Sequence, residues 1–414
     1  MFCTEYWATW VCRGAVVLAN RGGAVLPLVL STEAEAPKSL ALIGPHANTT
    51  SQLLGMYVGA GNQRIVQRSA LSVLGSRLGG RLEYAPGLPS LASTDISGFA
   101  AAAAAARRST TAVVMLGLCE QGHGCTEHEN QDRSTLGLPQ PQLALLKTVS
   151  AAAASTVCVF ISGGPLSVDA LDDLCDAALW TGYPGQAGAI GFVDVLLGSA
   201  APTGRLPYTL HWSNFTAARP MTSMAVRPRG TQPGATYRWF GDGGVLRPFG
   251  FGISLARFSW SWSSANKDDD PPTKTLSVAA VAAAAKQRTT VTTIDVTGLR
   301  LQAPSDQRLT AAGTAAVGVS ALGFVEAVPP DGEGRRLFGF TKLDSVLVGQ
   351  SRAVSIPLQA GSLTVVEPDG SRWVKPGHYR ISVDGAGDGA GSSAALTTVL
   401  VLTGQSVLVE MSPF

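Results

Sequence analysis

The residues best suited to chemistry lie together in one short segment, TEHENQDRS, at positions 126–134. Only 14% of all residues are charged, yet this segment holds three acids, an arginine and a histidine. They are Glu127, His128, Glu129, Asp132 and Arg133. Such a cluster can be an ion-paired surface turn, a metal site or the position of a catalytic carboxylate. The surrounding sequence has to decide among these three interpretations.

A metal site is the weakest interpretation. His123 and His128 stand near several acids, but their spacing matches no common zinc site, and no CxxC pair occurs in the chain. We therefore expect neither a metal nor another cofactor. The remaining histidines, His46, His211 and His378, are interpreted as structural or exposed residues.

Two of the six cysteines bracket the start of the same segment. Cys119 and Cys125 are placed to form a disulfide in an oxidising compartment, but the sequence leaves their pairing open. Cys158 stands inside the run TVCVFI, which is typical of a buried strand. We interpret Cys158 as a small hydrophobic core residue.

Composition excludes several classes of protein. The net charge is +2, so the chain has no electrostatic signature of a nucleic-acid partner or an anionic membrane. No run of eighteen apolar residues occurs, which argues against a membrane span. The first residues, MFCTEYWATWVCRG, lack the basic and apolar regions of a signal peptide.

The acidic segment follows a strand of an expected parallel sheet. Continuous apolar runs rich in β-branched residues predict strands buried on both faces; they are residues 39–44, 81–85, 111–117, 156–164 and 177–182. Helical patterns alternate with them at residues 95–108, 139–154 and 186–198. This alternation predicts an α/β/α sandwich with a mostly parallel sheet. Glu129 then lies on the loop after the strand at 111–117, where such sheets bind ligands.

The pattern changes after residues 261–275, SWSSANKDDDPPTKT, which are typical of a linker. Beyond them come six or seven short strands with alternating hydrophobicity and turn signals, among them PDG at 368–370. A run of strands without helices predicts a β-sandwich. Strands of the two regions are expected to lie in separate sheets.

Several ordered motifs carry a resemblance to a known family. They are GAVVLANRGGAVLPL (14–28), LALIGPHAN (40–48), YAPG (84–87), ISGGPLSVD (161–169), LWTGYPGQAG (179–188), GRLPYTL (204–210), PMTSMAVRP (220–228) and PFGFGIS (248–254). The chain resembles the C-terminal part of glycoside hydrolase family 3, most like its plant-type β-xylosidase and α-arabinofuranosidase branch. Downstream, LTVVEPDGSRWVKPGHYRISV resembles the fibronectin type III-like domain that ends many members.

The resemblance implies domain boundaries. It divides the chain into a remnant of the linker that follows the family's barrel, an α/β sandwich domain, a linker and a fibronectin type III-like β-sandwich. These are residues 1–37, 38–260, 261–275 and 276–414. The family's N-terminal (β/α)₈ barrel is missing, and we expect the chain to be a truncated copy. A barrel domain or a barrel-bearing chain is a possible partner.

The resemblance also implies retaining hydrolysis of β-linked cell-wall saccharides by an extracellular or wall-associated enzyme. The family's acid/base glutamate precedes an Asp-Arg pair, which places it at Glu129. Glu127 is the rival candidate and Glu120 a weaker one. Asp132 and Arg133 are expected to pair with each other and support the loop.

Three departures from the family pattern stand beside this assignment. The loop at residues 119–126 is a few residues longer than usual, and Asn130 replaces the usual glycine after the acid/base. The family's nucleophile is an aspartate that its barrel supplies from a Ser-Asp motif. Ser305-Asp306 is the sole such pair here and falls within the expected β-sandwich, so no nucleophile is assigned.

Two functions from different classes therefore remain. The chain is either the acid/base half of an exo-β-xylosidase-like enzyme or a catalytically inactive carbohydrate-binding or scaffolding remnant. In either case its expected ligand is an oligosaccharide or polysaccharide.

Overall fold

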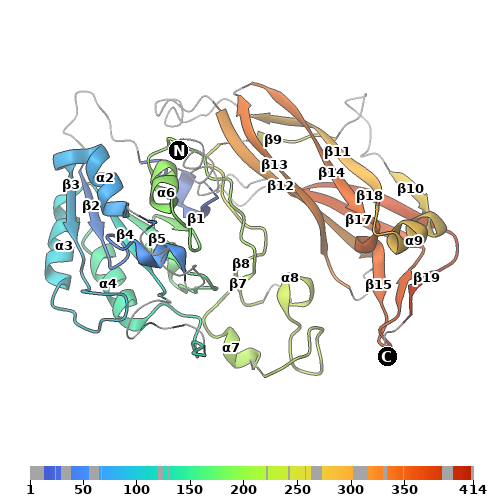
Figure 1. The fold of residues 1–414 in the computed structure, drawn as a ribbon, viewed down its shortest axis with the longest axis horizontal. Coiled ribbons are helices and arrows are strands. Elements are labelled where there is room, and N and C mark those ends of the chain that lie inside the picture. The colour runs from blue at the N-terminus through green and yellow to red at the C-terminus, as the bar shows by residue number, and fades with distance from the viewer. Residues whose placement is uncertain are drawn as a thin grey trace.

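The computed structural model contains an α/β body and an elongated β-sandwich side by side (Figure 1). The residues described are 14–23, 25–28, 39–55, 65–66, 68–119, 125, 127, 130–220, 222–240, 243–256, 258–262, 273–301, 316–329, 333–347, 349–384 and 395–411.

The α/β body is built on a six-stranded sheet in the order β1-β6-β5-β4-β2-β3. Its strands are β1 (Val16–Asn20), β2 (Leu40–Ile43), β3 (Leu82–Ala85), β4 (Thr111–Gly117), β5 (Thr156–Ile161) and β6 (Ala177–Trp180). All neighbours pair in parallel except β1, which lies antiparallel to β6 at one edge. The sheet is therefore mostly parallel, as the sequence predicts.

Helices cover both faces of this sheet. They are α2 (Ala70–Leu78), α3 (Phe99–Arg108), α4 (Gln140–Ser150), α5 (Leu171–Leu174) and α6 (Gly188–Leu196). Buried residues of α3, α4 and α5 form one core with one face of the strands, and those of α2 and α6 form a second core on the other face. The α/β/α sandwich is confirmed.

The structure also differs from the sequence analysis at the start of this body. β1 belongs to the sheet, although it precedes residue 38, where we expected the domain to begin. The short run VVLAN is buried at all five positions, because β6 pairs with it and one hydrophobic core covers each of its faces. Helix α2 was not predicted either, although the hydroxyl of Ser69 caps it by accepting from Ser72 N.

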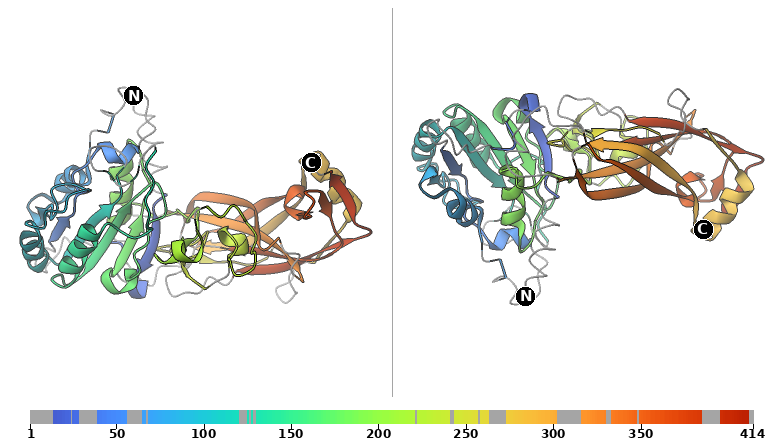
Figure 2. Two further views of the ribbon diagram at one scale, coloured as in Figure 1. Left: turned by 90° about the horizontal axis from the view of Figure 1, so that it is seen from below. Right: turned by 90° about the horizontal axis from the view of Figure 1, so that it is seen from above.

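The second body is a β-sandwich (Figure 2). It contains a five-stranded sheet with the order β10-β18-β17-β12-β13 and two three-stranded sheets with the orders β14-β11-β9 and β15-β16-β19. The strands are β9 (Phe258–Ser259), β10 (Lys274–Ser277), β11 (Thr290–Leu301), β12 (Ala316–Val328), β13 (Arg336–Leu347), β14 (Ser351–Gln359), β15 (Thr364–Val366), β16 (Arg372–Val374), β17 (Gly377–Asp384), β18 (Leu396–Thr403) and β19 (Val407–Glu410). Inward residues of the five-stranded sheet and of the sheet β14-β11-β9 share one hydrophobic core. Among the described residues, none of its strands joins the sheet of the α/β body.

One helix interrupts the sandwich, so the expectation of strands alone is wrong for α9 (Val278–Lys286). Its sequence, VAAVAAAAK, favours a helix, and the hydroxyl of Ser277 caps it by accepting from Ala280 N at 3.2 Å. Strands β10 and β18 pair in parallel, whereas the other strand pairs of the sandwich are antiparallel.

A connecting segment ties the two bodies together. It contains β7 (Leu210–His211), α7 (Phe215–Ala218), α8 (Thr236–Trp239) and β8 (Val245–Arg247). Just before this segment, Arg205 donates to Ser320 O at 3.1 Å, and the Ser320 hydroxyl donates to Thr203 O at 2.8 Å.

Four short 3₁₀ helices complete the described elements: Arg21–Gly23, Ser51–Leu54, Gly79–Arg81 and Ala360–Leu363. In the described part of the chain, none of the helices is long and apolar enough to span a membrane.

The interpretation of Cys158 as a simple core residue is wrong. Cys158 in β5 forms a disulfide with Cys175, which directly follows α5. Both residues are buried within the same core. The bond links the middle of the sheet to the chain that leads into β6.

Candidate active site

The candidate catalytic loop is the segment after β4 that carries Glu127 and Glu129, and it starts at Gly117, the last residue of this strand. Gly117 has a φ of +150°, and a Cβ atom there would lie 1.9 Å from the carbonyl oxygen of Ile161 at the end of β5. Only glycine allows the two strand ends to approach so closely. Leu118 N donates to the same oxygen at 2.9 Å. The chain thus leaves the sheet at its carboxyl edge, where ligand sites of α/β sheets lie.

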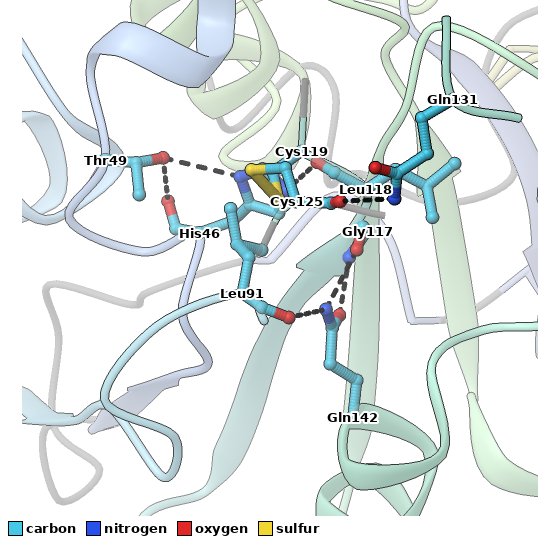
Figure 3. The surroundings of a disulfide bond; sticks show 9 residues. All are labelled: His46, Thr49, Leu91, Gly117, Leu118, Cys119, Cys125, Gln131 and Gln142. Carbon is cyan, nitrogen blue, oxygen red and sulfur yellow. Dashed lines mark hydrogen bonds between the residues drawn. A yellow bond between two sulfur atoms is a disulfide. The ribbon is translucent and has the colours of Figure 1, made fainter. Parts of the chain in front are cut away.

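Gln142 of α4 fixes this strand end from within the core (Figure 3). Its side-chain oxygen accepts from Gly117 N, and its amide nitrogen donates to Gly117 O and Leu91 O, all at 2.9 Å. The amide therefore uses its acceptor and both donors in a buried position. Gln142 is not among the functional residues predicted from the sequence. The available signal was a polar residue on the helix face that also carries Leu146 and Val149.

His46, in the turn after β2, supports the next residue of the loop. Its Nε2 lies 3.0 Å from Leu118 O and its Nδ1 lies 3.3 Å from the Thr49 hydroxyl (Figure 3). Because a carbonyl oxygen only accepts, Nε2 carries the proton. His46 is completely buried, and this burial lowers the pKa of its imidazole to about 4, opposed by the hydrogen bond to Leu118. The structural role that we expected for His46 is therefore specific: it holds the root of the loop.

His46 makes the stability of the chain depend on pH. The unfolded chain binds a proton at this residue below its usual pKa of 6.5, whereas the folded chain does so only near pH 4. Acid therefore favours unfolding, and we expect a loss of about 2–3 kcal/mol between pH 7 and pH 4.5 from this residue. Urea unfolding at both values should show that His46→Gln lacks this part of the loss. Equal losses in both proteins would contradict the assignment.

The Cys119–Cys125 disulfide closes the first part of the loop, so the pairing that the sequence left open is present (Figure 3). The two Cα atoms are 5.2 Å apart, and both cysteines pack against Leu91. Gln131 Nε2 donates to Cys125 O at 3.4 Å. The bond joins Cys125, two residues before Glu127, to Cys119, two residues after the end of β4.

Glu127 and Arg133 form the ion pair of this loop. Arg133 Nε donates to Glu127 Oε2 at 2.6 Å, Nη1 donates to Thr135 O at 3.1 Å, and Nη2 donates to Pro165 O at 2.8 Å. The Glu127 and Arg133 side chains are only 19% and 12% exposed, and among the described residues Glu127 Oε1 is buried without a partner. Arg133 therefore links Glu127 and Thr135 of the loop to Pro165, in the chain that follows β5.

The expected ion pair between Asp132 and Arg133 is wrong. Asp132 is exposed to solvent, and the carboxylate partner of Arg133 is Glu127. A guanidinium that leaves water needs a partner that leaves water with it. Glu127 meets this condition, whereas Asp132 stays hydrated at the surface. The supporting role of Arg133 is retained with a different partner.

Glu129, the predicted acid/base, lies outside the described residues, as do Glu120, His123 and His128. The next residue, Asn130, is described and has a φ of +65°. This left-handed conformation favours glycine, and asparagine is among the few other residues that adopt it readily. Asn130 therefore adopts a backbone conformation that glycine also adopts readily.

Two further groups were considered from the sequence, a metal site and the Ser305-Asp306 pair. No group of three or more His, Cys, Asp or Glu side chains among the described residues is arranged to hold a metal ion. Ser305 and Asp306 lie outside the described part of the chain.

Comparison with known sequences identifies the α/β body. Residues 15–255 match the glycosyl hydrolase family 3 C-terminal domain. The chain belongs to glycoside hydrolase family 3.

Curated relatives of this family 3 chain include fungal xylosidases. It is 29% identical over 376 residues to the exo-1,4-β-xylosidase xlnD of Aspergillus niger. It is 31% identical over 407 residues to the probable exo-1,4-β-xylosidase bxlB of Aspergillus clavatus. The alignments cover 90% and 97% of this chain but only 45% and 48% of the relatives. The chain thus spans about half the length of the curated relatives it matches.

Solved structures with a similar fold include two glycosidases. A family 3 exo-β-xylosidase, XlnD, in complex with a xylobiose aziridine activity-based probe, has a TM-score of 0.81 at 25% identity, covering 100% of this chain and 50% of that chain. The β-glucosidase from Listeria innocua in complex with isofagomine has a TM-score of 0.69 at 20% identity, covering 95% and 49%. The second likeness concerns the fold alone.

Proposed function

We propose that this family 3 chain supplies the acid/base half of a retaining exo-β-xylosidase-like hydrolase, with Glu129 as general acid/base. Its substrates are β-linked saccharides of plant cell walls. The names of the curated relatives support the reaction and the sugar. The observation that supports the assignment of Glu129 is the left-handed conformation of Asn130. The resemblance places the family's glycine at this residue, directly after the acid/base, and glycine favours this conformation.

The proposed chemistry divides the work between two carboxyl groups. Retaining hydrolysis requires them about 5–5.5 Å apart on either side of the scissile bond. Glu129 protonates the leaving oxygen and then removes a proton from the attacking water. The nucleophilic carboxylate is not assigned to any of these 414 residues. We propose that a barrel domain supplies it at the carboxyl edge of the sheet.

In this proposal Glu127 anchors the loop and does not donate the proton. One of its oxygens accepts from Arg133, and the other has no accessible surface. A general acid must reach the leaving oxygen directly or through one water molecule. The buried contact with Arg133 keeps the Glu127 carboxylate from this task. It also fixes the backbone two residues before Glu129.

The dependence of rate on the leaving group tests these roles. In a protein that joins these residues to a family 3 barrel, we expect Glu129→Gln to slow hydrolysis of xylobiose by about 100-fold or more. Hydrolysis of 2,4-dinitrophenyl β-xyloside should slow far less, because an activated phenolate leaves without protonation. Glu127→Gln is the matched control, and it should affect both substrates equally.

Two outcomes would contradict the assignment. If Glu127→Gln shows the dependence on the leaving group and Glu129→Gln does not, the acid/base lies two residues earlier. If neither variant shows it, the lengthened loop has removed the acid from the site. The chain would then be a carbohydrate-binding or scaffolding relative.

We also propose that the protein works outside the cytosol. Cys119–Cys125 and Cys158–Cys175 are both paired, and disulfides persist in oxidising compartments. An extracellular or cell-wall location agrees with a substrate that lies in the wall.

A further inference from the structure

A cavity of about 600 Å³ lies between the α/β body and the β-sandwich. Its wall includes the end of β1, the chain just before β6, residues 246–253 and two side chains of the sandwich, Arg335 and Asp384. Asp176 directly precedes β6, so this part of the wall lies at the amino end of the strand. The candidate catalytic loop leaves the opposite, carboxyl edge of the sheet. The cavity is therefore distinct from the proposed active site.

The wall of the cavity carries an excess of positive charge. It includes four guanidinium groups and three carboxylates, namely Arg21, Arg205, Arg247 and Arg335 with Asp172, Asp176 and Asp384. Each carboxylate has its own arginine: Asp172 pairs with Arg247, Asp176 with Arg21, and Asp384 with Arg335. Of these four arginines, Arg205 is therefore the one that forms no ion pair with a described residue.

Arg205 is surrounded by neutral acceptors. Its Nη1 donates to Gly250 O and Gly252 O at 3.2 Å, and its Nη2 donates to Ser320 O at 3.1 Å. Burial lowers the pKa of its guanidinium to about 10, and the charge of Asp384 opposes this only in part. A buried cation of this kind gains from an anion in contact with it.

Arg335 supplies hydrogen-bond donors on the sandwich side of the cavity. Its Nη2 binds Asp384 Oδ2 and the Ser382 hydroxyl, and its guanidinium carbon lies 3.8 Å from the centre of the Phe324 ring. Both hydrogen bonds of the Arg335 side chain to described residues use Nη2. Its Nε and Nη1 atoms are therefore available to donate to a ligand. The side chain is 39% exposed, so a ligand in the cavity can reach it.

We propose that this cavity binds a small organic anion of about monosaccharide size, whose carboxylate or phosphate group lies against Arg205 and Arg335. The volume falls within the range of small-molecule sites. Guanidinium groups match the planar pairs of oxygens that carboxylates and phosphates present. The remaining wall, with its paired charges and backbone, suits the hydroxyl groups of a sugar ring. Binding here is independent of glycoside hydrolysis.

Isothermal titration of the 414-residue chain at low salt tests the proposal. The probes are D-glucuronate, D-glucose 6-phosphate and, as the neutral control, D-glucose. We expect saturable binding of at least one anion and no binding of glucose up to about 10 mM. The anion that binds decides between carboxylate and phosphate. Failure of both anions, or equal binding of glucose, would overturn the proposal.

Variants locate the binding. Arg335→Gln should weaken binding of the anion by at least about tenfold, because it removes a charge-assisted contact. Arg335→Lys should weaken it less, since the charge remains. The matched control is Arg380→Gln, which breaks the ion pair between Arg380 and Glu326 on neighbouring strands of the same sandwich. Equal affinities for Arg335→Gln, Arg335→Lys and Arg380→Gln would also overturn the proposal. No step of this test measures turnover, so its result is independent of the role of Glu129.

Discussion

Expressed alone, these 414 residues are expected to hydrolyse aryl β-xylosides at least about a thousandfold more slowly than the same residues joined to a family 3 barrel. The reason is that retaining hydrolysis needs a nucleophile as well as an acid/base, and loss of a catalytic nucleophile costs several orders of magnitude. Initial rates with 4-nitrophenyl β-xyloside, at equal protein concentrations, give the comparison.

The control for this result is the joined protein with the barrel nucleophile replaced by alanine. Its rate should fall to that of the chain alone, which shows that the missing carboxylate and not the missing binding surface limits the reaction. Turnover by the chain alone within tenfold of the joined protein would refute the division of labour between the two halves. A second carboxylate within these residues would then have to be sought.

The strands of the parallel sheet could be predicted because their signal is local. TAVVMLG was expected at residues 111–117, and β4 occupies those residues, buried at six of seven positions. A strand covered on both faces has to be apolar throughout, so its sequence alone identifies it. The position of the candidate loop follows from the same argument, since a loop after such a strand leaves the carboxyl edge.

Pairings between distant residues could not be predicted in the same way. β1 is also mostly apolar, but its place at the sheet edge depends on β6. Cys158 has the composition of a core position, and only the fold brings Cys175 next to it. Arg133 follows Asp132 in the sequence, yet it pairs with Glu127, because the fold buries most of the Arg133 and Glu127 side chains side by side. In each case the sequence identifies the residue and the tertiary structure chooses its partner.

The contact between the connecting segment and the sandwich includes a buried acid, Glu333. Its carboxylate accepts from the Nη2 atoms of Arg227 and Arg238, one at each oxygen. Arg238 Nε donates to Glu333 O at 3.1 Å, and Val366 N lies 3.3 Å from Oε1. The Glu333 side chain is only 4% exposed, whereas those of Arg227 and Arg238 are 41% and 26% exposed. One carboxylate therefore balances two guanidinium groups across the junction of the two bodies.

Replacing Glu333 with glutamine should lower the free energy of unfolding by about 3 kcal/mol. The amide keeps the shape of the side chain but removes the charge that pairs with both arginines, and it leaves Arg238, whose side chain is only 26% exposed, with a partly buried charge that has lost this partner. The partial exposure of Arg227 places the effect at the lower end of the range for broken buried pairs. Glu410→Gln is the matched control, because Glu410 also pairs with an arginine, Arg372, but its own side chain is 59% exposed, in contrast to the buried Glu333. That variant should lose less than about 1 kcal/mol. Urea unfolding followed by tryptophan fluorescence measures both losses, and equal values would show that the Glu333 cluster does not hold the two bodies together.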